Sequence, residues 1–218
     1  MTNAKGIDVS HHQGRIDWEA VGAAGYSFTF IKATENASYT DSRFAANWQD
    51  AKAAGFVRGA YHYFHPSTDP ARQAAFFVNT VGGWDPTDIS PALDVEISDQ
   101  DAASLALSST EWTDRTSTCL SEIARLSGRV PSIYLTAWGS DVWKTKIAQT
   151  TAPSWANNYL LWVSSFPAAQ PEILKGWSTW TFWQFDTKGK VNGIDGQVDL
   201  DQFNGTLEVL LEWLKPGQ

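Results

Sequence analysis

The sequence predicts an α/β fold, in which strands and helices alternate to form a barrel that becomes irregular towards its C-terminus. Two successive segments share one plan, a helix stopped by glycine and followed at once by a strand. The length of 218 residues suits one such barrel better than two small domains. The sequence has no linker, low-complexity run or charge block, so we expect one domain over residues 1–218.

The first of these segments runs from Asp17 to Gly25 and leads into the strand-like residues 26–31 (YSFTFI). The second runs from Asp41 to Gly55, with apolar residues at helical spacing, and leads into residues 56–61 (FVRGAY). In both, an aspartate stands at the N-cap position and a glycine just past the helix end. This repetition predicts successive βα units.

Two later helices are predicted from their end signals. Asp69 precedes a proline at the first helical position, and this helix should end near residues 82–83 (GG). Ser108 and Glu111 form a capping box, and Gly128 marks the end of that helix. Further strands are expected at residues 6–10, 91–97, 132–136, 159–163, 179–185 and near 197–200. Few convincing helices separate the last of these strands, which predicts the irregular C-terminal part.

Composition narrows the classes of function. A formal net charge of −8 argues against a nucleic-acid binder, which would normally show a basic face. No run approaches the ~18 apolar residues of a membrane span, and residues 1–5 do not lead into the apolar stretch of a signal peptide. Cys119 stands alone, so it can form no intrachain disulfide and no zinc cluster. The 12 tryptophans weakly favour a carbohydrate-binding cleft.

The most informative stretch is residues 91–97 (PALDVEI). Its alternation places Asp94 and Glu96 on one face of a strand and the apolar residues on the other. Two acids at this spacing have backbones about 6.5–7 Å apart. They repel each other, so one should hold its proton to higher pH than the other. Glycoside hydrolysis needs such a pair, a proton donor and a charged carboxylate.

Polar residues also stand near the ends of other predicted strands, where a barrel carries its active site. They are Asp8, Lys32, His62 and Asp199. We expect Lys32 and Glu35 to form an ion pair.

Five motifs together resemble family 25 of the glycoside hydrolases, the 1,4-β-N-acetylmuramidases or lysozymes. They are residues 6–10 (GIDVS), 30–35 (FIKATE), 59–63 (GAYHY), 93–96 (LDVE), and 183–185 (WQF) through 198–200 (VDL), in the family's order and over nearly the whole chain. The resemblance implies a flattened barrel related to the TIM barrel. It also implies Glu96 as general acid/base, Asp94 as its charged partner, and Asp8 and Asp199 as further cleft carboxylates.

The same resemblance implies a substrate and a place of action. The substrate is bacterial peptidoglycan, cut at the β-1,4 bond between N-acetylmuramic acid and N-acetylglucosamine without a cofactor. We expect a monomeric catalytic domain that acts outside the cell or is delivered to the wall, by secretion or as a phage-type endolysin. The family usually has glycine after residues 32–35, where this sequence has Asn36. Because asparagine tolerates left-handed backbone, we expect a preserved turn. Many members carry a cell-wall-binding module, and residues 1–218 show none.

Two retaining routes remain open for Asp94. It is either a direct nucleophile or the group that orients and stabilises the substrate's own 2-acetamido group as that group attacks. The resemblance favours the second route. A chitinase-like hydrolase and a non-catalytic glycan-binding barrel are the alternative functions. The chitinase motif needs further aspartates immediately upstream of the acid pair, and this sequence lacks them. A glycan-binding barrel has no need of a mutually repelling acid pair.

Expectations also follow for the remaining polar and aromatic residues. His62 is expected either as a hydrogen bonder in the cleft wall or as a core histidine. Tyr61, Tyr63 and Trp183 are expected to line the sugar site. Asp201 is expected on a turn and is left out of the site. The histidine pairs could be imagined as metal ligands, but the sequence has no His-Glu-x-x-His pattern, and we expect no metal.

Overall fold

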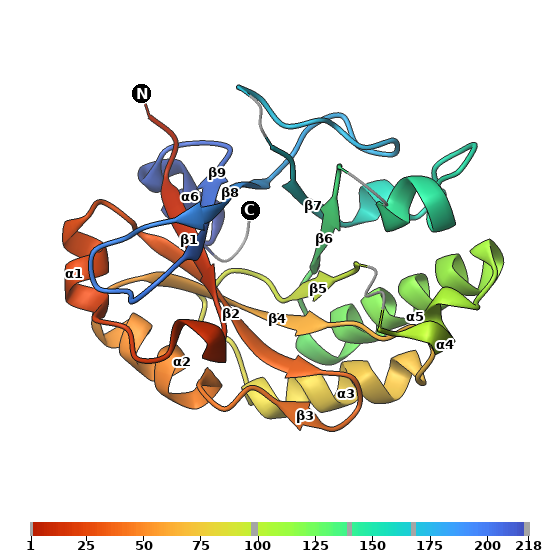
Figure 1. The fold of residues 1–218 in the computed structure, drawn as a ribbon, viewed down its shortest axis with the longest axis horizontal. Coiled ribbons are helices and arrows are strands. Elements are labelled where there is room, and N and C mark those ends of the chain that lie inside the picture. The colour runs from red at the N-terminus through yellow and green to blue at the C-terminus, as the bar shows by residue number, and fades with distance from the viewer. Residues whose placement is uncertain (1, 97–99, 139–140, 167–168, 216–218) are drawn as a thin grey trace.

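The computed structural model describes residues 2–96, 100–138, 141–166 and 169–215. These residues form a nine-stranded sheet in the order β1-β9-β8-β7-β6-β5-β4-β2-β3 (Figure 1). An additional pairing between β1 and β2 closes the sheet, all but β3, into a barrel. The strands are β1 (Lys5–Val9), β2 (Phe28–Glu35), β3 (Tyr39–Thr40), β4 (Val57–Tyr63), β5 (Ala92–Asp94), β6 (Ser132–Thr136), β7 (Leu160–Ser164), β8 (Phe182–Gly189) and β9 (Val198–Phe203).

Strand direction determines where polar side chains gather. Parallel pairings link β1, β2, β4, β5, β6, β7 and β8. Among the strands of the described ranges, only β9 runs antiparallel within the barrel, between β8 and β1. The carboxyl ends of the parallel strands therefore meet at one mouth of the barrel, where active sites of such folds lie. The predicted α/β barrel is confirmed.

The helices are α1 (Trp18–Ala23), α2 (Phe44–Ala53), α3 (Pro70–Val81), α4 (Ala102–Leu105), α5 (Ser109–Ser127) and α6 (Leu207–Trp213). Short segments lie at η1 (His11–Gln13), η2 (Trp143–Ile147) and η3 (Ala156–Asn158). Figure 1 shows α2, α3 and α5 along the side formed by β2, β4 and β5. After β6, the only helical segments among the described residues are η2, η3 and the seven-residue α6. The irregular C-terminal part is therefore confirmed.

Most predicted helix ends are confirmed. The side chains of Asp17, Asp69 and Ser108 each accept a hydrogen bond from the backbone N–H of the third helical residue. Gly128 ends α5 in the left-handed conformation, with φ of 69°. The N-cap prediction for Asp41 is wrong, because α2 begins after Arg43 without a side-chain cap. The Asp41 carboxylate instead accepts from the backbone N–H groups of His11 and Arg43.

The hydrophobic core has two layers, one inside the barrel and one between the strands and the helices. Inside, the rings of Phe28, Phe30 and Phe182 pack edge to face or tilted. Gly6 and Gly59 make room for them, because a Cβ atom would lie 2.3 Å from the Phe28 ring at Gly6 and 2.8 Å from the Phe30 ring at Gly59. Aromatic rings therefore fill the inner part of the barrel.

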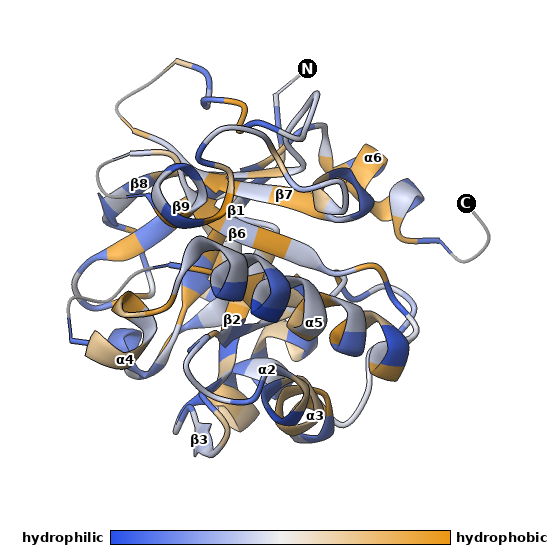
Figure 2. Ribbon diagram, turned by 90° about the vertical axis from the view of Figure 1, so that its right-hand side faces the viewer, coloured by the Kyte–Doolittle hydropathy of each residue, from blue (hydrophilic) through white to orange (hydrophobic). Residues whose placement is uncertain are grey.

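Hydropathy follows these layers. Figure 2 shows hydrophilic residues on the outward-facing turns of α3 and α5. Cys119 of α5 is free and fully buried on the inner side of that helix. Among the described residues, no helix combines the length and apolar character needed to cross a bilayer.

Candidate active site

The two carboxylates of the 93–96 motif lie at the mouth of the barrel. Asp94 is the last residue of β5, and Glu96 follows the strand end by two residues. Both line a cavity of about 260 Å³. Leu93 and Val95 point the opposite way and are buried against the helices, as the alternation predicted. Ile97, the last residue of the predicted strand, lies outside the described residues.

Two further carboxylates complete the acidic wall. Asp8 of β1 and Asp199 of β9 face each other in the antiparallel register and line the same cavity. Burial, followed by the charge of Asp8, raises the pKa of Asp199 to about 8. Burial also raises the pKa of Asp8 well above its usual range. The acidic cleft implied by the five motifs is therefore present in the structure.

Burial is the main cause of the pKa shifts of Asp94 and Glu96. Burial, and then the charge of Glu96, raise the pKa of Asp94 well above its usual range, while the Lys32 ammonium opposes this rise. Burial likewise raises the pKa of Glu96 against the effect of Lys32. Because neighbouring carboxylates disfavour double ionisation, one member of the pair keeps its proton to higher pH than an isolated carboxyl group does. Asp94 is 6% exposed and Glu96 is only half-buried, so Glu96 is the acid that a substrate reaches first.

A hydrogen-bonded chain fixes the floor of the cavity. The Tyr134 hydroxyl donates to Oε1 of Gln184 over 2.9 Å, and Nε2 of Gln184 donates to Oδ2 of Asp8 over 2.8 Å. The Trp162 indole stacks on Phe30, with ring centroids 4.1 Å apart. Tyr134, Trp162 and Gln184 all line the cavity and were not predicted. The alternation of residues 132–136 places Tyr134 inward, which was a usable signal.

The side walls combine aromatic and charged groups. Tyr61 and Tyr63 of β4 line the cavity, where the sequence placed them. Lys32 lies over the Tyr63 ring, 4.8 Å from its centroid, and its Nζ is 2.6 Å from Oε2 of Glu35. The predicted ion pair between Lys32 and Glu35 is confirmed. This ion pair holds the Lys32 ammonium beside the four carboxyl groups that line the cavity.

A second charged link continues from Glu35 away from the cavity. His65 Nε2 lies 3.0 Å from Oε1 of Glu35, and its Nδ1 lies 2.8 Å from Oδ2 of Asp101. The hydrogen bond to Glu35 raises the pKa of His65, and the same bond lowers the pKa of Glu35 to about 2. Glu35 is therefore a fixed negative charge that anchors Lys32.

His62 does not lie in the cleft wall, so the substrate-contact prediction for it is wrong. Its ring is fully buried on the helix side of β4, because Tyr61 and Tyr63 occupy the inward positions. Nδ1 lies 2.8 Å from the Thr34 hydroxyl, and Nε2 lies 3.2 Å from Oε1 of Gln73. His62 is a core histidine with both nitrogens satisfied.

Trp183 is also misplaced by the sequence prediction. It is only 6% exposed, packs in the layer between strands and helices, and donates from Nε1 to the Ser165 carbonyl. On β8 the inward position belongs to Gln184. The prediction for Asp201 was also wrong, because it placed this residue on a turn. It lies on β9 and not on a turn, and it is fully buried.

The remaining polar predictions concern the histidine pairs and the turn at Asn36. His11 Nδ1 lies 2.8 Å from Asp41, and His12 lines the acidic cavity. Within the part of the chain that the structure describes, no group of three or more His, Cys, Asp or Glu residues is arranged to hold a metal ion. Asn36 has φ of 52° and carries the turn after β2, as predicted.

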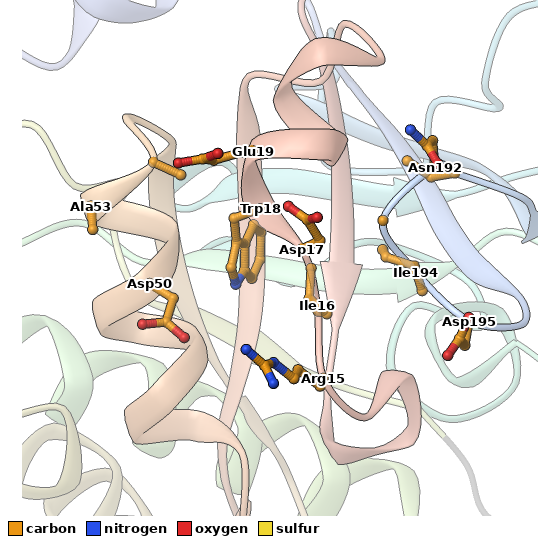
Figure 3. Close-up of a pocket in the computed structure, with 13 residues that line it drawn as sticks. Arg15, Ile16, Asp17, Trp18, Glu19, Asp50, Ala53, Asn192, Ile194 and Asp195 are labelled. Atoms are coloured by element: carbon orange, nitrogen blue, oxygen red, sulfur yellow. The ribbon is translucent and has the colours of Figure 1, made fainter.

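A larger hollow of about 880 Å³ lies elsewhere on the molecule (Figure 3). It lies between α1, the end of α2 and the β8–β9 loop, and its lining includes Arg15, Trp18 and Asp50. None of the four cleft carboxylates lines it. Size therefore does not identify the reactive site, and the smaller cavity holds the paired acids.

The comparisons with known proteins agree with this geometry. Residues 7–194 match the family model described as glycosyl hydrolases family 25. The chain belongs to glycosyl hydrolase family 25. Over 217 residues it is 37% identical to Lysozyme M1 of Streptomyces globisporus, covering 96% of this chain and 71% of that protein.

Two solved structures of similar proteins extend the match to the whole fold. The bacterial lysozyme from Streptomyces coelicolor superimposes with a TM-score of 0.90 at 35% identity, covering 100% of both chains. A muramidase from Trichobolus zukalii gives a TM-score of 0.85 at 31% identity, covering 97% of this chain and 99% of that one. This family 25 chain is a glycoside hydrolase, and its fold is that of the lysozymes it resembles.

Proposed function

We propose that this glycoside hydrolase is a lysozyme that cuts the β-1,4 bond between N-acetylmuramic acid and N-acetylglucosamine in bacterial peptidoglycan. The observation that carries the proposal is the pairing of Asp94 and Glu96 within one cavity of four carboxylates at the barrel mouth. A buried acid pair that retains a proton is the arrangement that glycoside hydrolysis requires.

Glu96 is the general acid in this proposal. It is the more exposed member of the pair, so the oxygen of the leaving sugar can reach it, and this exposure assigns the proton transfer to Glu96. Burial raises the pKa of both carboxyl groups, and that of Asp94 further, so the pKa shifts alone do not select the acid. Asp94 is the charged partner. Once Glu96 holds the proton of the pair, Asp94 faces the positive charge that develops at the anomeric carbon.

The environment of Asp94 supports the substrate-assisted route. Its Oδ1 is buried and has no hydrogen-bond partner among the described residues. An unpaired buried carboxylate oxygen is costly, and a bound donor removes that cost. The N–H of a 2-acetamido group is such a donor. Accepting it orients the acetamido oxygen towards the anomeric carbon and stabilises the positive charge of the cyclic intermediate.

Asp8, Asp199, Tyr61 and Tyr63 are proposed to hold the sugar. Their side chains line the same cavity from β1, β9 and β4. Carboxylates accept hydrogen bonds from sugar hydroxyls, and aromatic rings pack against the apolar face of a pyranose. The domain is proposed to work as a monomer over residues 1–218. We infer action on the cell wall after secretion or phage-type release.

Product analysis tests the function directly. Purified peptidoglycan is digested, the new reducing ends are reduced with borohydride, and the sugar alcohols are identified by mass spectrometry. A muramidase leaves N-acetylmuramic acid at every new reducing end. N-acetylglucosamine as the sole new terminus contradicts the proposal, and equal release by Glu96→Gln and the wild type contradicts the assignment of the acid.

A further inference from the structure

Asp201 lies deeper in the barrel than the four cleft carboxylates. It is 0% exposed and lies on β9, two residues from Asp199. The Trp162 indole N–H donates to its Oδ1 over 2.9 Å. Asp201 does not line the acidic cavity, so a substrate in that cavity does not touch it.

The other oxygen of Asp201 is also buried. Among the described residues, no N–H or hydroxyl group donates to Oδ2. On the paired strands β1 and β9, Asp201 lies opposite Gly6 and Asp8 lies opposite Asp199, so Asp8 and Asp201 are diagonal neighbours, and both are buried. Each carboxyl group shifts the pKa of the other through a side-chain hydrogen bond between them. Two carboxylates have only acceptors, so this contact bonds only when one of them is protonated. The arrangement is that of a carboxyl dyad holding one proton.

We propose that Asp201 is a positioning residue, which shares one proton with Asp8 and so fixes the Asp8 carboxyl group at the wall of the cleft. The role of Asp8 towards glycan rests on the proposed function, whereas the shared proton does not. Gln184 holds Asp8 from the β8 side with its 2.8 Å hydrogen bond. The Asp201 contact supplies the second fixed bond, from β9.

The charged groups around this dyad favour retention of its proton. Burial, opposed by the Trp162 hydrogen bond, raises the pKa of Asp201 to about 8. When they ionise, Asp199 on the same strand raises the pKa of Asp201, and Glu96 beyond β5 raises the pKa of Asp8. The other ionisable groups facing the cavity are Asp94, Tyr61, Tyr63, Tyr134, His12 and the single cation Lys32. The dyad therefore loses its proton only on the alkaline side of neutrality.

A shared proton changes how the stability of the fold depends on pH, and the direction of that change can be measured. A carboxyl group whose folded pKa lies above its unfolded value binds more protons in the native state. Its contribution to stability is complete below the unfolded pKa of about 4 and is lost as the pH rises towards about 8. An asparagine at position 201 accepts from Trp162 with its oxygen and donates to Asp8 with its nitrogen, without titrating.

The experiment compares the wild type with Asp201→Asn, Asp201→Ala and the exposed control Asp114→Asn, using the full chain. Thermal midpoints are measured from pH 4 to pH 9, and peptidoglycan turnover is measured at pH 5. The midpoint difference between Asp201→Asn and the wild type should grow by several degrees in favour of the variant as the pH rises. Asp114→Asn should follow the wild type. Asp201→Ala should lose at least tenfold in turnover, and Asp201→Asn should restore most of it.

Each arm has an outcome that overturns the proposal. Parallel midpoint curves for Asp201→Asn and the wild type mean that no proton is shared. Full turnover in a folded Asp201→Ala means that Asp201 does not position Asp8, and an inactive but folded Asp201→Asn means that its role is not hydrogen bonding. A wild type that releases nothing from peptidoglycan defeats the proposed function, while the midpoint curves still decide the shared proton.

Discussion

Gln184 and Asp8 are joined by a 2.8 Å hydrogen bond between strands that are 176 residues apart in sequence. The amide oxygen of the same glutamine accepts from Tyr134, so one side chain connects β1, β6 and β8 beneath the acidic cavity. Gln184 does not ionise, yet it holds the Asp8 carboxyl group in place. Because the three strands meet only in the closed barrel, the position of Asp8 in the cleft depends on barrel closure.

Gln184→Leu should weaken both stability and turnover. It removes the Gln184 hydrogen bond from each of the buried Asp8 and Tyr134 side chains, which costs about 1–3 kcal/mol of unfolding free energy for each. Turnover should fall by about tenfold or more, because Asp8 is no longer held. Urea denaturation and peptidoglycan turnover check this, with exposed Gln170→Leu as control. Unchanged turnover in a folded variant contradicts a positioning role for Gln184.

Lys32 should set the pH range of activity. Its ammonium lowers the pKa of both Asp94 and Glu96, so Lys32→Met should raise both values. The acid limb reports the carboxylate that must be charged, and the alkaline limb reports the acid that must stay protonated. Both limbs of the kcat/KM profile should therefore move to higher pH. Lys52→Met, which breaks an exposed ion pair, is the control, and a shift to lower pH would contradict the account.

His62 should make the fold acid-sensitive. Burial lowers its pKa to about 4, whereas an unfolded histidine titrates near 6.5. The unfolded state therefore binds the proton first, and stability is lost as the pH falls from about 6.5 to about 4, by about 3 kcal/mol at most. Urea unfolding of His62→Gln between pH 4 and pH 7 should show a shallower decline than the wild type. Exposed His12→Gln should not, and equal slopes for His62→Gln and the wild type would refute the buried neutral ring.

The acetamido group should take part in the reaction. In a small activated substrate, replacing the 2-acetamido group with hydroxyl should remove most of the rate if the group attacks the anomeric carbon. A direct Asp94 nucleophile would still turn this substrate over and leave a glycosyl-enzyme. Mass spectrometry of the quenched enzyme distinguishes the two routes, because an adduct on Asp94 excludes assistance. A product with inverted anomeric configuration would exclude both routes, because both retain the configuration.

Local signals predicted most of the fold. The capping box at Ser108 and the stops at Gly82 and Gly128 act within a few residues, so they can be recognised without knowing the tertiary structure. Asp41 failed as a cap because it is used over a distance, binding His11. A side chain that could cap a helix can instead bind a tertiary partner, and the sequence alone does not reveal that partner.

The site was predicted in part for the same reason. Asp94 and Glu96 were found because alternation on one strand is a local pattern. His62 and Trp183 were misplaced because their facing depends on strand phase within the closed barrel, where Tyr61 and Gln184 point inward. Asp201 was missed because β9 continues past the predicted strand end to Phe203.

Leaving-group dependence tests the central claim most directly. Glu96 is proposed to protonate the departing sugar, so the cost of Glu96→Gln should depend on how much protonation that group needs. On peptidoglycan, whose sugar leaving group is poor, the variant should lose about 10²–10⁴-fold in kcat. The second substrate is an aryl glycoside of the same sugar with an acidic phenol as leaving group. On it, the rate of the first step, in which the phenol departs, should stay close to that of the wild type. Asp94→Asn should slow both substrates, and an equal loss for Glu96→Gln on both would contradict its role as the acid.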